Sequence, residues 1–403
     1  MPSAVFVFGC AEFFMPFGLY LLGLAVFAQG TSEFMLSGLV PDIARDLGVS
    51  VPAAGSLTSA FAVGMIAGAP LMAVVSRRWS RRGALLGFLG IFLVVHVVGA
   101  VTSDFSVLLV TRIVGALANA GFLAVAVVTA VGMVDAKAKG RATSVLLGGV
   151  TVACVAGVPG GAWLGQVWGW RSAFWAVVVL SVPALFAILR SVPSGVPDVA
   201  RVSVRQEVRA LRGPRLQLAL LLGALVNGAT FCTFTYLAPV VTSVTGLGAA
   251  WVPVVLALFG LGSFVGVSVG GRIADVRPVP LLVVGGVALL IGWSVFALSA
   301  GNPVAAAVLA FVQGALSFAV GSTMISQALY AAADAPTLAG GFATAAFNVG
   351  AAVGPWVGGV VIGAGFGYRS PLWVSAGLVG VALAVGVTGR RSRAVAAPAS
   401  PPV

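Results

Sequence analysis

Long stretches without a charged residue are the feature that most limits how this chain can fold. Residues 56–75 and 83–103 contain no Asp, Glu, Lys or Arg, yet the segment SRRWSRR between them holds four arginines. A helix needs roughly 20 residues to cross about 30 Å of hydrocarbon, so runs of this length are typical of membrane spans. Only 8% of all residues are charged, whereas a soluble domain carries about 25%. These patterns predict an all-α membrane protein.

Twelve apolar segments, separated by loop signals and charges, are long enough to cross a bilayer as helices. The predicted spans are residues 17–41, 53–75, 83–102, 106–131, 142–166, 171–189, 215–243, 252–274, 279–299, 303–330, 338–365 and 371–389. The spans form an N-terminal six-helix bundle (17–189) and a C-terminal six-helix bundle (215–389). A leader of unknown role (1–16) precedes them, a cytoplasmic linker (190–214) joins them, and a cytoplasmic tail (390–403) follows.

The basic residues predict the orientation of these spans. With the N-terminus inside the cell, 18 of the 22 Lys and Arg residues fall in cytoplasmic loops or the tail, and three fall outside. Cytoplasmic loops of membrane proteins carry such an excess of positive charge. The sequence therefore predicts a multi-pass protein of the cell membrane with both termini in the cytoplasm. The net charge of +12 follows from these loops, so no nucleic-acid partner is expected.

A repeat with an offset of 198 residues relates the two bundles. The motif GWRSAFW (169–175) enters the sixth span, and GYRSPLW (367–373) enters the twelfth. Because each bundle has an even number of spans, both keep the same orientation. Parallel repeats of this kind are expected for a transporter whose two halves rock around a central site.

Glycines spaced by four residues recur in the second and fifth spans of each bundle, where they let helix backbones approach closely. Because the pattern follows the repeat, it predicts a sliding interface between the two halves, with generic tight packing as the alternative. The stripes are Gly64 and Gly68; Gly157, Gly161 and Gly165; Gly262, Gly266 and Gly270; and Gly350, Gly354 and Gly358, with Pro159 and Pro355 expected to bend their helices.

Motifs for nucleotides, metals and redox chemistry are missing from the sequence. There is no GxxxxGKS segment, and the three cysteines form no CxxC pair. No cofactor, metal or enzymatic activity is therefore expected. The linker 190–214 is compatible with a short helix on an anionic membrane surface or with a solvated connection.

Several motifs resemble those of the major facilitator superfamily over nearly the whole chain. RIVGALANAG (112–121) resembles its helix 4 motif with a buried arginine, and GVPGGAWLG (157–165) resembles its helix 5 antiporter motif, which is found in exporters. After the second span, Ala73, Arg77 and Ser80 stand where the superfamily pattern has glycine, aspartate and glycine; the second copy, GRIADVRP, keeps Gly271 and Asp275. The resemblance implies gating roles for Arg77, Arg78, Arg81, Arg82, Gly157, Pro159, Gly161, Asp275 and Gly354.

A closer resemblance is to twelve-helix drug:proton antiporters. The segments 30–55, 68–82, 346–359 and 367–373 are similar to those of actinobacterial chloramphenicol-resistance exporters, and also to bacterial sugar-efflux proteins. This resemblance implies a bacterial cytoplasmic membrane, a small-molecule drug substrate, protons as the coupling ion and a monomer in the lipid bilayer.

Few ionisable groups lie within the predicted spans: Glu33, His96 and Arg112. A charge in mid-membrane costs about 2.5–3.5 kcal/mol, so such residues are expected to be functional. At 1.5 Å per residue, Glu33 and Arg112 lie about 12 Å and about 9 Å from the outer surface. They are expected to carry proton coupling, with Asp42 at the outer rim as the next candidate. A structural ion pair between Glu33 and Arg112 is the alternative, and His96 is interpreted as a packed or snorkelling residue.

Aromatic and amide side chains in the spans are candidate drug contacts, because small-molecule sites combine apolar walls with a few polar groups. The alternative is that they face lipid or neighbouring helices. The candidates are Asn119, Asn227, Phe231, Tyr236, Gln313, Phe347, Asn348 and Trp356.

Three functions remain open on the sequence. The leading hypothesis is proton-coupled efflux of small amphiphilic antibiotics, chloramphenicol or related phenicols, by alternating access. The second is export of sugars or another small polar metabolite. The third is a membrane receptor or scaffold that does not transport.

Overall fold

The computed structural model describes residues 16–75, 79–135, 138–192, 213–331 and 336–396, and within these ranges it contains helices and no strands. Eleven helical stretches are long and apolar enough to cross a membrane, and a twelfth span results if the bent pair α1 (Phe17–Phe34) and α2 (Leu36–Asp46) is one span. The predicted all-α membrane fold of twelve spans is confirmed.

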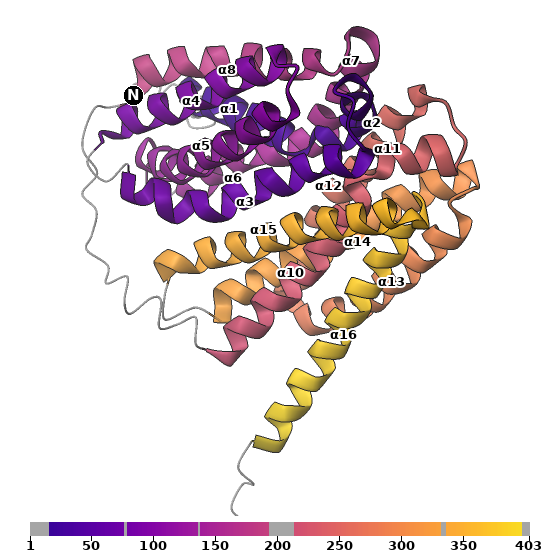
Figure 1. Cartoon of the computed structure of the whole chain (residues 1–403). Helices are drawn as coiled ribbons and strands as arrows, with labels where there is room; N and C mark the ends of the chain where they lie inside the picture. Colours follow the sequence, from indigo (N-terminus) through magenta and orange to yellow (C-terminus); the bar gives the residue numbers. More distant parts are fainter. Residues whose placement is uncertain (1–15, 76–78, 136–137, 193–212, 332–335, 397–403) are drawn as a thin grey trace, which may run out of the picture.

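The first half of the described chain forms one group of helices (Figure 1), which share a continuous buried core. Its fifth span, Lys139–Trp168, consists of two α-helices joined by a π-helical segment, Ala153–Gly157. After α1 and α2 the elements are α3 (Val51–Val75), α4 (Arg81–Val101), α5 (Phe105–Gly132), α6 (Lys139–Val152), η4 (Ala153–Gly157), α7 (Val158–Trp168) and α8 (Arg171–Ser191).

The second half forms a second group (Figure 1), whose core also takes in side chains of the first half, such as Phe34, Cys154 and Val158. Its elements are α10 (Pro214–Thr235), α11 (Leu237–Pro239), η5 (Val240–Val244), η6 (Ala249–Trp251), α12 (Val252–Val276), α13 (Pro278–Ser299), α14 (Pro303–Ala331), α15 (Pro336–Val361), η7 (Ile362–Phe366) and α16 (Ser370–Ala396).

The predicted limit of the first span is wrong. The sequence analysis expects the first span to end at Pro41. The helix instead bends by 52° at the break around Met35 and continues through Pro41 to Asp46. The predicted last span, 371–389, agrees with the apolar stretch Ser370–Thr388, and its helix α16 continues beyond that stretch to Ala396.

The 198-residue repeat is visible in local structure. Gly169 and Gly367, which precede α8 and α16, have φ angles of 81° and 74°, a conformation that glycine adopts without a steric penalty. Ser172 and Ser370 each donate a hydrogen bond of 2.7 Å from the side-chain hydroxyl to the carbonyl of the corresponding glycine. Both copies of the motif therefore start their helices in the same way.

The glycine stripes pack inside each half. Gly64 lies against Ile113 of α5, and Gly262, 198 residues later, lies against Phe311 of α14. The prediction that these stripes form a sliding interface between the halves is wrong. They pack tightly against other helices of their own half, which is the alternative. Glycine spacing marks a close approach without specifying which helix approaches. The fifth spans behave alike: Gly157 lies against Thr31, Gly161 against Met35, Gly354 against Gly228 and Gly358 against Cys232.

The two halves meet along α3 and α15, which lie side by side in Figure 1. We call the end of the molecule that carries Trp170 the Trp170 end, and the opposite end, where α8 stops and α10 starts, the linker end. At the Trp170 end, Gln166 donates a 2.6 Å hydrogen bond to the carbonyl of Ala249 in the other half. Pro52 of α3 also approaches Gly359 of α15. These contacts join the halves at the Trp170 end.

Candidate functional site

A buried polar network centres on Ser32 of α1. Arg112 of α5 donates from Nη1 to the Ser32 hydroxyl at 2.9 Å and from Nη2 to the Ser32 carbonyl at 2.8 Å. The same hydroxyl lies 2.6 Å from Nε2 of His96, whose Nδ1 lies 2.6 Å from the carbonyl of Phe92. Because a carbonyl only accepts, a neutral His96 carries its proton on Nδ1 and accepts from Ser32 through Nε2. The network ties α1, α4 and α5 together.

The guanidinium of Arg112 is also held by an aromatic ring. Its Cζ lies 4.4 Å from the centroid of Phe61 on α3, within the range of a cation–π interaction. Seven residues further along α5, Asn119 donates to the sulfur of Met65, which is one turn after Phe61 on α3, at 3.6 Å. The predicted residues Arg112 and Asn119 therefore lie along one packed seam between α3 and α5.

Glu33 lies beside this network without joining it. No ion pair between Glu33 and Arg112 forms in the described part of the chain, where the ion pairs are Arg45–Asp42 and Arg171–Asp46. The expected direct bond is replaced by the two bonds from Arg112 to Ser32. The charge of Arg112 still attracts the Glu33 carboxylate through space, and Glu33 is half-buried.

Gln29 is a polar residue that the sequence analysis missed. Its side chain is 1% exposed, and neither amide atom has a hydrogen-bond partner in the protein. Leaving a buried polar group unpaired costs about 1–3 kcal/mol, so such an amide favours a polar ligand. Gln29 lies four residues before Glu33, one turn along the same helix face. That spacing was the available signal, but Gln29 carries no charge to draw attention.

Aromatic rings from both halves meet next to Glu33. The ring centroids of Phe34 and Phe231 lie 5.7 Å apart, and those of Phe231 and Phe234 lie 6.0 Å apart. Together with Thr230 and Cys154 they border a small cavity between the halves. Phe231 was predicted as a drug contact, whereas Phe34 and Phe234 were not.

The remaining predicted drug contacts in the second half use their polar groups on the protein itself. Their donors pair with backbone carbonyls: Asn227 with Phe347 at 2.7 Å, Tyr236 with Pro355 at 2.9 Å, Gln313 with Leu289 at 3.2 Å and Asn348 with Thr344 at 2.9 Å.

The side chains of Phe347, Gln313 and Trp356 point to different neighbours. The Phe347 ring lies against Gly223 of α10 and Gly321 of α14. Gln313 reaches toward α13, and Trp356 is 60% exposed. The structure therefore brings Glu33, Arg112, Asn119 and Phe231 into one region, and it leaves Gln313 and Trp356 outside it.

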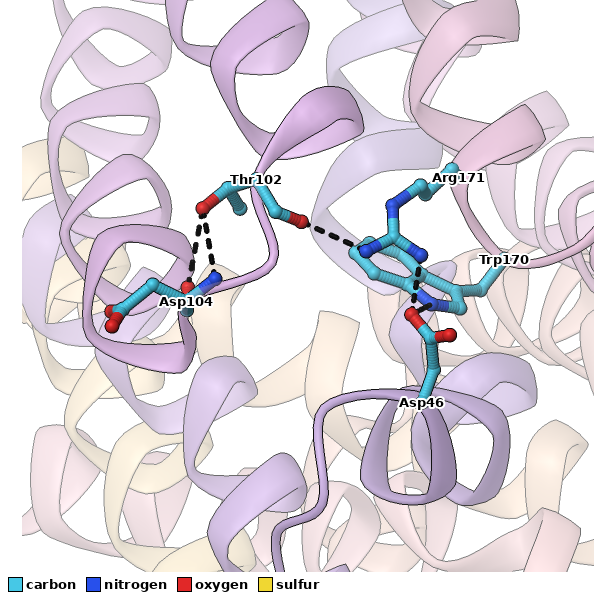
Figure 2. Close-up of polar contacts among 5 residues, drawn as sticks. All are labelled: Asp46, Thr102, Asp104, Trp170 and Arg171. Carbon is cyan, nitrogen blue, oxygen red and sulfur yellow. Dashed lines mark hydrogen bonds and ion pairs between the residues drawn. The ribbon is translucent and has the colours of Figure 1, made fainter.

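A second polar cluster lies at the Trp170 end (Figure 2). Asp46 accepts from Nη1 of Arg171 in an ion pair, and Oδ2 of Asp46 accepts from Nε1 of Trp170 at 3.0 Å. Nη2 of Arg171 donates to the carbonyl of Thr102 at 2.9 Å. This cluster joins α2 to the start of α8 and to the loop before α5, and the sequence analysis did not predict it.

Asp46 ends α2 beyond the apolar part of its span, and its carboxylate is 45% exposed. The hydrogen bond from Arg171, helped by that from Trp170, lowers the pKa of Asp46 below its ordinary value. Asp42, one turn earlier, forms a 3.2 Å ion pair with Arg45. That pair lies apart from the Ser32 network.

The predicted gating residues after the second span are partly described. Ser80 caps α4 by accepting from the backbone N–H of Gly83 at 3.0 Å. The Arg81 guanidinium lies against Gly132 at the C-terminal end of α5, where a helix dipole favours a cation. Arg82 is half-buried in the first turn of α4. Arg77, Arg78 and the side chain of Asp275 lie outside the described residues.

The family model of the Major Facilitator Superfamily matches residues 22–340. The chain is 58% identical over 388 residues to a "Chloramphenicol resistance protein" of Streptomyces lividans, covering 96% of this chain and 99% of that protein. It is 36% identical over 366 residues to the "Inner membrane transport protein YdhP" of Escherichia coli K12, covering 91% of this chain and 94% of that protein.

Solved structures share the fold at low sequence identity. A bacterial homologue of the human lysosomal transporter Spinster, in an inward-facing and occupied conformation, superposes with a TM-score of 0.73 at 18% identity, covering 93% of this chain and 96% of that chain. The nucleoside transporter NupG superposes with a TM-score of 0.74 at 12% identity, covering 92% and 99%. By its sequence motifs, its twelve spans and its relatives, this chain belongs to the major facilitator superfamily of membrane transporters.

Proposed function

We propose that this transporter exports chloramphenicol or a related phenicol in exchange for protons. The observation that carries the proposal is the 58% identity to the Streptomyces lividans chloramphenicol resistance protein over nearly the full length of both chains. A membrane transporter gives resistance by moving the drug out of the cell. The proposal includes a monomer in the bacterial cytoplasmic membrane with the linker end in the cytoplasm, as the basic loops indicate.

In this proposal, the drug binds between the halves beside Glu33. A phenicol has an aromatic ring at one end and hydroxyl and amide groups along the rest of its length. Phe34 and Phe231 offer rings for the aromatic end, and Gln29 offers an unpaired amide donor and acceptor for the polar part. The drug is neutral, so it needs no opposite charge in its site.

Glu33 is the proposed proton carrier. Arg112 directs two donors to Ser32, so the Glu33 carboxylate is attracted by the arginine without being bonded to it. When the site opens to the outside, a proton binds Glu33 and removes that attraction. When it opens to the cytoplasm, drug binding favours loss of the proton. Each half-cycle then depends on which ligand the site holds, as alternating access requires.

The proposed motion is a rocking of the two predicted bundles, residues 17–189 and 215–389, joined by the linker 190–214. Contacts at the Trp170 end, such as Gln166 with Ala249, would open when the site faces outward. The segments around Gly157–Gly161, which include Pro159, and around Gly354 would accommodate the motion inside each half. Arg81, Arg82 and Asp275, with Arg77 and Arg78, would latch the linker end.

Drug-susceptibility profiling in a bacterial host whose own pumps are deleted tests the proposed function. Expression should raise the inhibitory concentration of chloramphenicol, and Glu33→Gln should remove the effect at equal protein levels. Unchanged phenicol susceptibility together with lower toxicity of a sugar analogue would favour the second hypothesis, export of a polar metabolite. The buried, unpaired hydroxyl groups of Thr31 on α1 and Thr58 on α3, which suit a polar ligand, are the observation that favours this second hypothesis.

A further inference from the structure

A large cavity of the described chain lies away from the proposed transport site. It has a volume of about 560 Å³ and is lined by four helices of the second half, α10, α13, α14 and α16. This volume is within the range of about 300–1,000 Å³ typical of ligand pockets. Its walls are almost entirely aliphatic, and its few polar side chains are Arg215, Gln327 and Tyr330.

The polar groups sit at one end of this cavity. Arg215 is in the first turn of α10, and Gln327 and Tyr330 are in the last turns of α14, so all three lie at the linker end. Val226, which also lines the cavity, is eleven residues after Arg215 on α10. At 1.5 Å per residue, the cavity extends about 16 Å along the helix axis. That length matches one leaflet, half of a hydrocarbon core of about 30 Å.

Arg215 gives the mouth of the cavity a positive charge. The two ion pairs of the described chain are Arg45–Asp42 and Arg171–Asp46, both in the first half. Arg215 therefore forms no ion pair with another described residue. Tyr330 is 73% exposed beside it, and tyrosine is typical of the interface where lipid headgroups lie. The mouth therefore presents a cation and an interfacial aromatic at headgroup level.

We propose that this cavity binds one anionic phospholipid from the leaflet at the linker end, with an acyl chain inside and the phosphate on Arg215. A phospholipid is polar at one end and apolar along its length, as the cavity is. A phenicol carries polar groups along its length, and the aliphatic wall would leave them without partners at a cost. The site is thus distinct from the drug site near Glu33.

Mass spectrometry of the intact full chain released from detergent micelles tests this site. The delipidated protein is titrated with phosphatidylglycerol or phosphatidylcholine that have identical acyl chains. We expect one phosphatidylglycerol per chain, preferred about fivefold over phosphatidylcholine, the effect of one basic residue at an anionic surface. Arg215→Gln should reduce the preference to about one while an acyl chain still binds. Arg272→Gln, which changes an exposed arginine outside the cavity, should keep the preference.

A pair of neighbouring valines on α13 provides the matched control for the cavity itself. Val283 lines the cavity, whereas Val284 is 68% exposed and does not. Val283→Trp should reduce binding of both lipids at least about tenfold, since each buried methylene contributes to binding, and Val284→Trp should leave it unchanged. If Val283→Trp does not fold, Ala382→Phe fills the same cavity and carries the same expectation.

Two results would overturn the proposal. One is equal binding of the two lipids to the wild-type chain. The other is displacement of the lipid by chloramphenicol in the wild type with loss of drug binding in the filled variants, which would make this cavity a drug site.

Discussion

Arg112 donates two hydrogen bonds to Ser32, from Nη1 to the hydroxyl at 2.9 Å and from Nη2 to the backbone carbonyl at 2.8 Å. These two hydrogen bonds fix α5 against α1 and orient the Ser32 hydroxyl toward His96. They also hold a positive charge one residue away from Glu33 without forming an ion pair with it. The proposed proton carrier and its cation are therefore held apart by geometry.

Removing the Ser32 hydroxyl should destabilise the protein. Ser32→Ala leaves Nη1 of Arg112 and Nε2 of His96 without a partner, at a cost of about 1–3 kcal/mol for a buried unpaired group. Ser59→Ala is the control, because the buried hydroxyl of Ser59 has no hydrogen-bond partner to lose. Thermal melting of the purified variants in detergent measures both. Equal melting temperatures for the two variants would contradict the network.

Gln29→Leu should separate binding from stability. The buried amide has no protein partner, so its removal should leave the melting temperature unchanged or raise it. Drug affinity should fall about tenfold, the effect of one lost hydrogen bond of about 1.4 kcal/mol. Gln313→Leu is the matched control, since its Nε2 bonds to Leu289: stability should fall and drug affinity should not change. Isothermal titration with chloramphenicol gives the affinities, and the reverse pattern would show that Gln29 is only structural.

Acid should weaken the cluster at the Trp170 end. The pKa of Asp46 is lowered in the folded protein, chiefly by the hydrogen bond from Arg171. The stability from this ionised carboxylate is therefore fully present above its unfolded pKa of about 3.9 and is lost as pH falls through the lower folded pKa. Because Asp46 is 45% exposed, the contribution is at most about 1 kcal/mol.

The difference in melting temperature between wild type and Asp46→Asn measures this effect. It should be constant between about pH 5 and pH 8 and should shrink below about pH 4. Arg171→Gln should remove the same pH dependence. A difference that grows as the solution becomes more acidic would contradict the assignment.

Gly354, one of the glycines of α15 that face α10, should not tolerate a methyl group. A Cβ at Gly354 would overlap the backbone of Gly228, and overpacking of this kind costs about 1–3 kcal/mol. Gly377→Ala is the control, because a Cβ there meets no atom within 4 Å, and alanine favours helix by up to about 1 kcal/mol over glycine. Melting curves should separate the two variants in opposite directions. A Gly354→Ala variant as stable as Gly377→Ala would contradict the close packing.

The spans and the repeat were predictable from the sequence, because charge-free runs and the motif pair at residues 169 and 367 report on local chemistry. The bend at Met35 was not, since neither glycine nor proline marks it; α2 is held there by packing against α7 and α11. The partners of the glycine stripes were also beyond the sequence, because any helix can fill the groove that glycine leaves.

The candidate site was predicted in its charges and missed in its neutral members. The cost of burying a charge singled out Glu33 and Arg112. Depth alone could not show that Arg112 would bond to Ser32, which precedes Glu33 by one residue and lies about 100° around the helix from it. Gln29 became visible only when the structure showed its amide buried without a partner.

Proton-driven transport by the Glu33→Gln variant tests the central claim most directly. Wild-type and variant proteins are purified, matched for melting temperature and drug affinity, and reconstituted into vesicles with an imposed pH gradient, and chloramphenicol flux is followed. Asp42→Asn, which changes the carboxylate paired with Arg45, is the matched control. The account predicts gradient-driven flux in the wild type and in Asp42→Asn, and none in Glu33→Gln although it still binds the drug. Wild-type flux in a well-folded Glu33→Gln protein would contradict it.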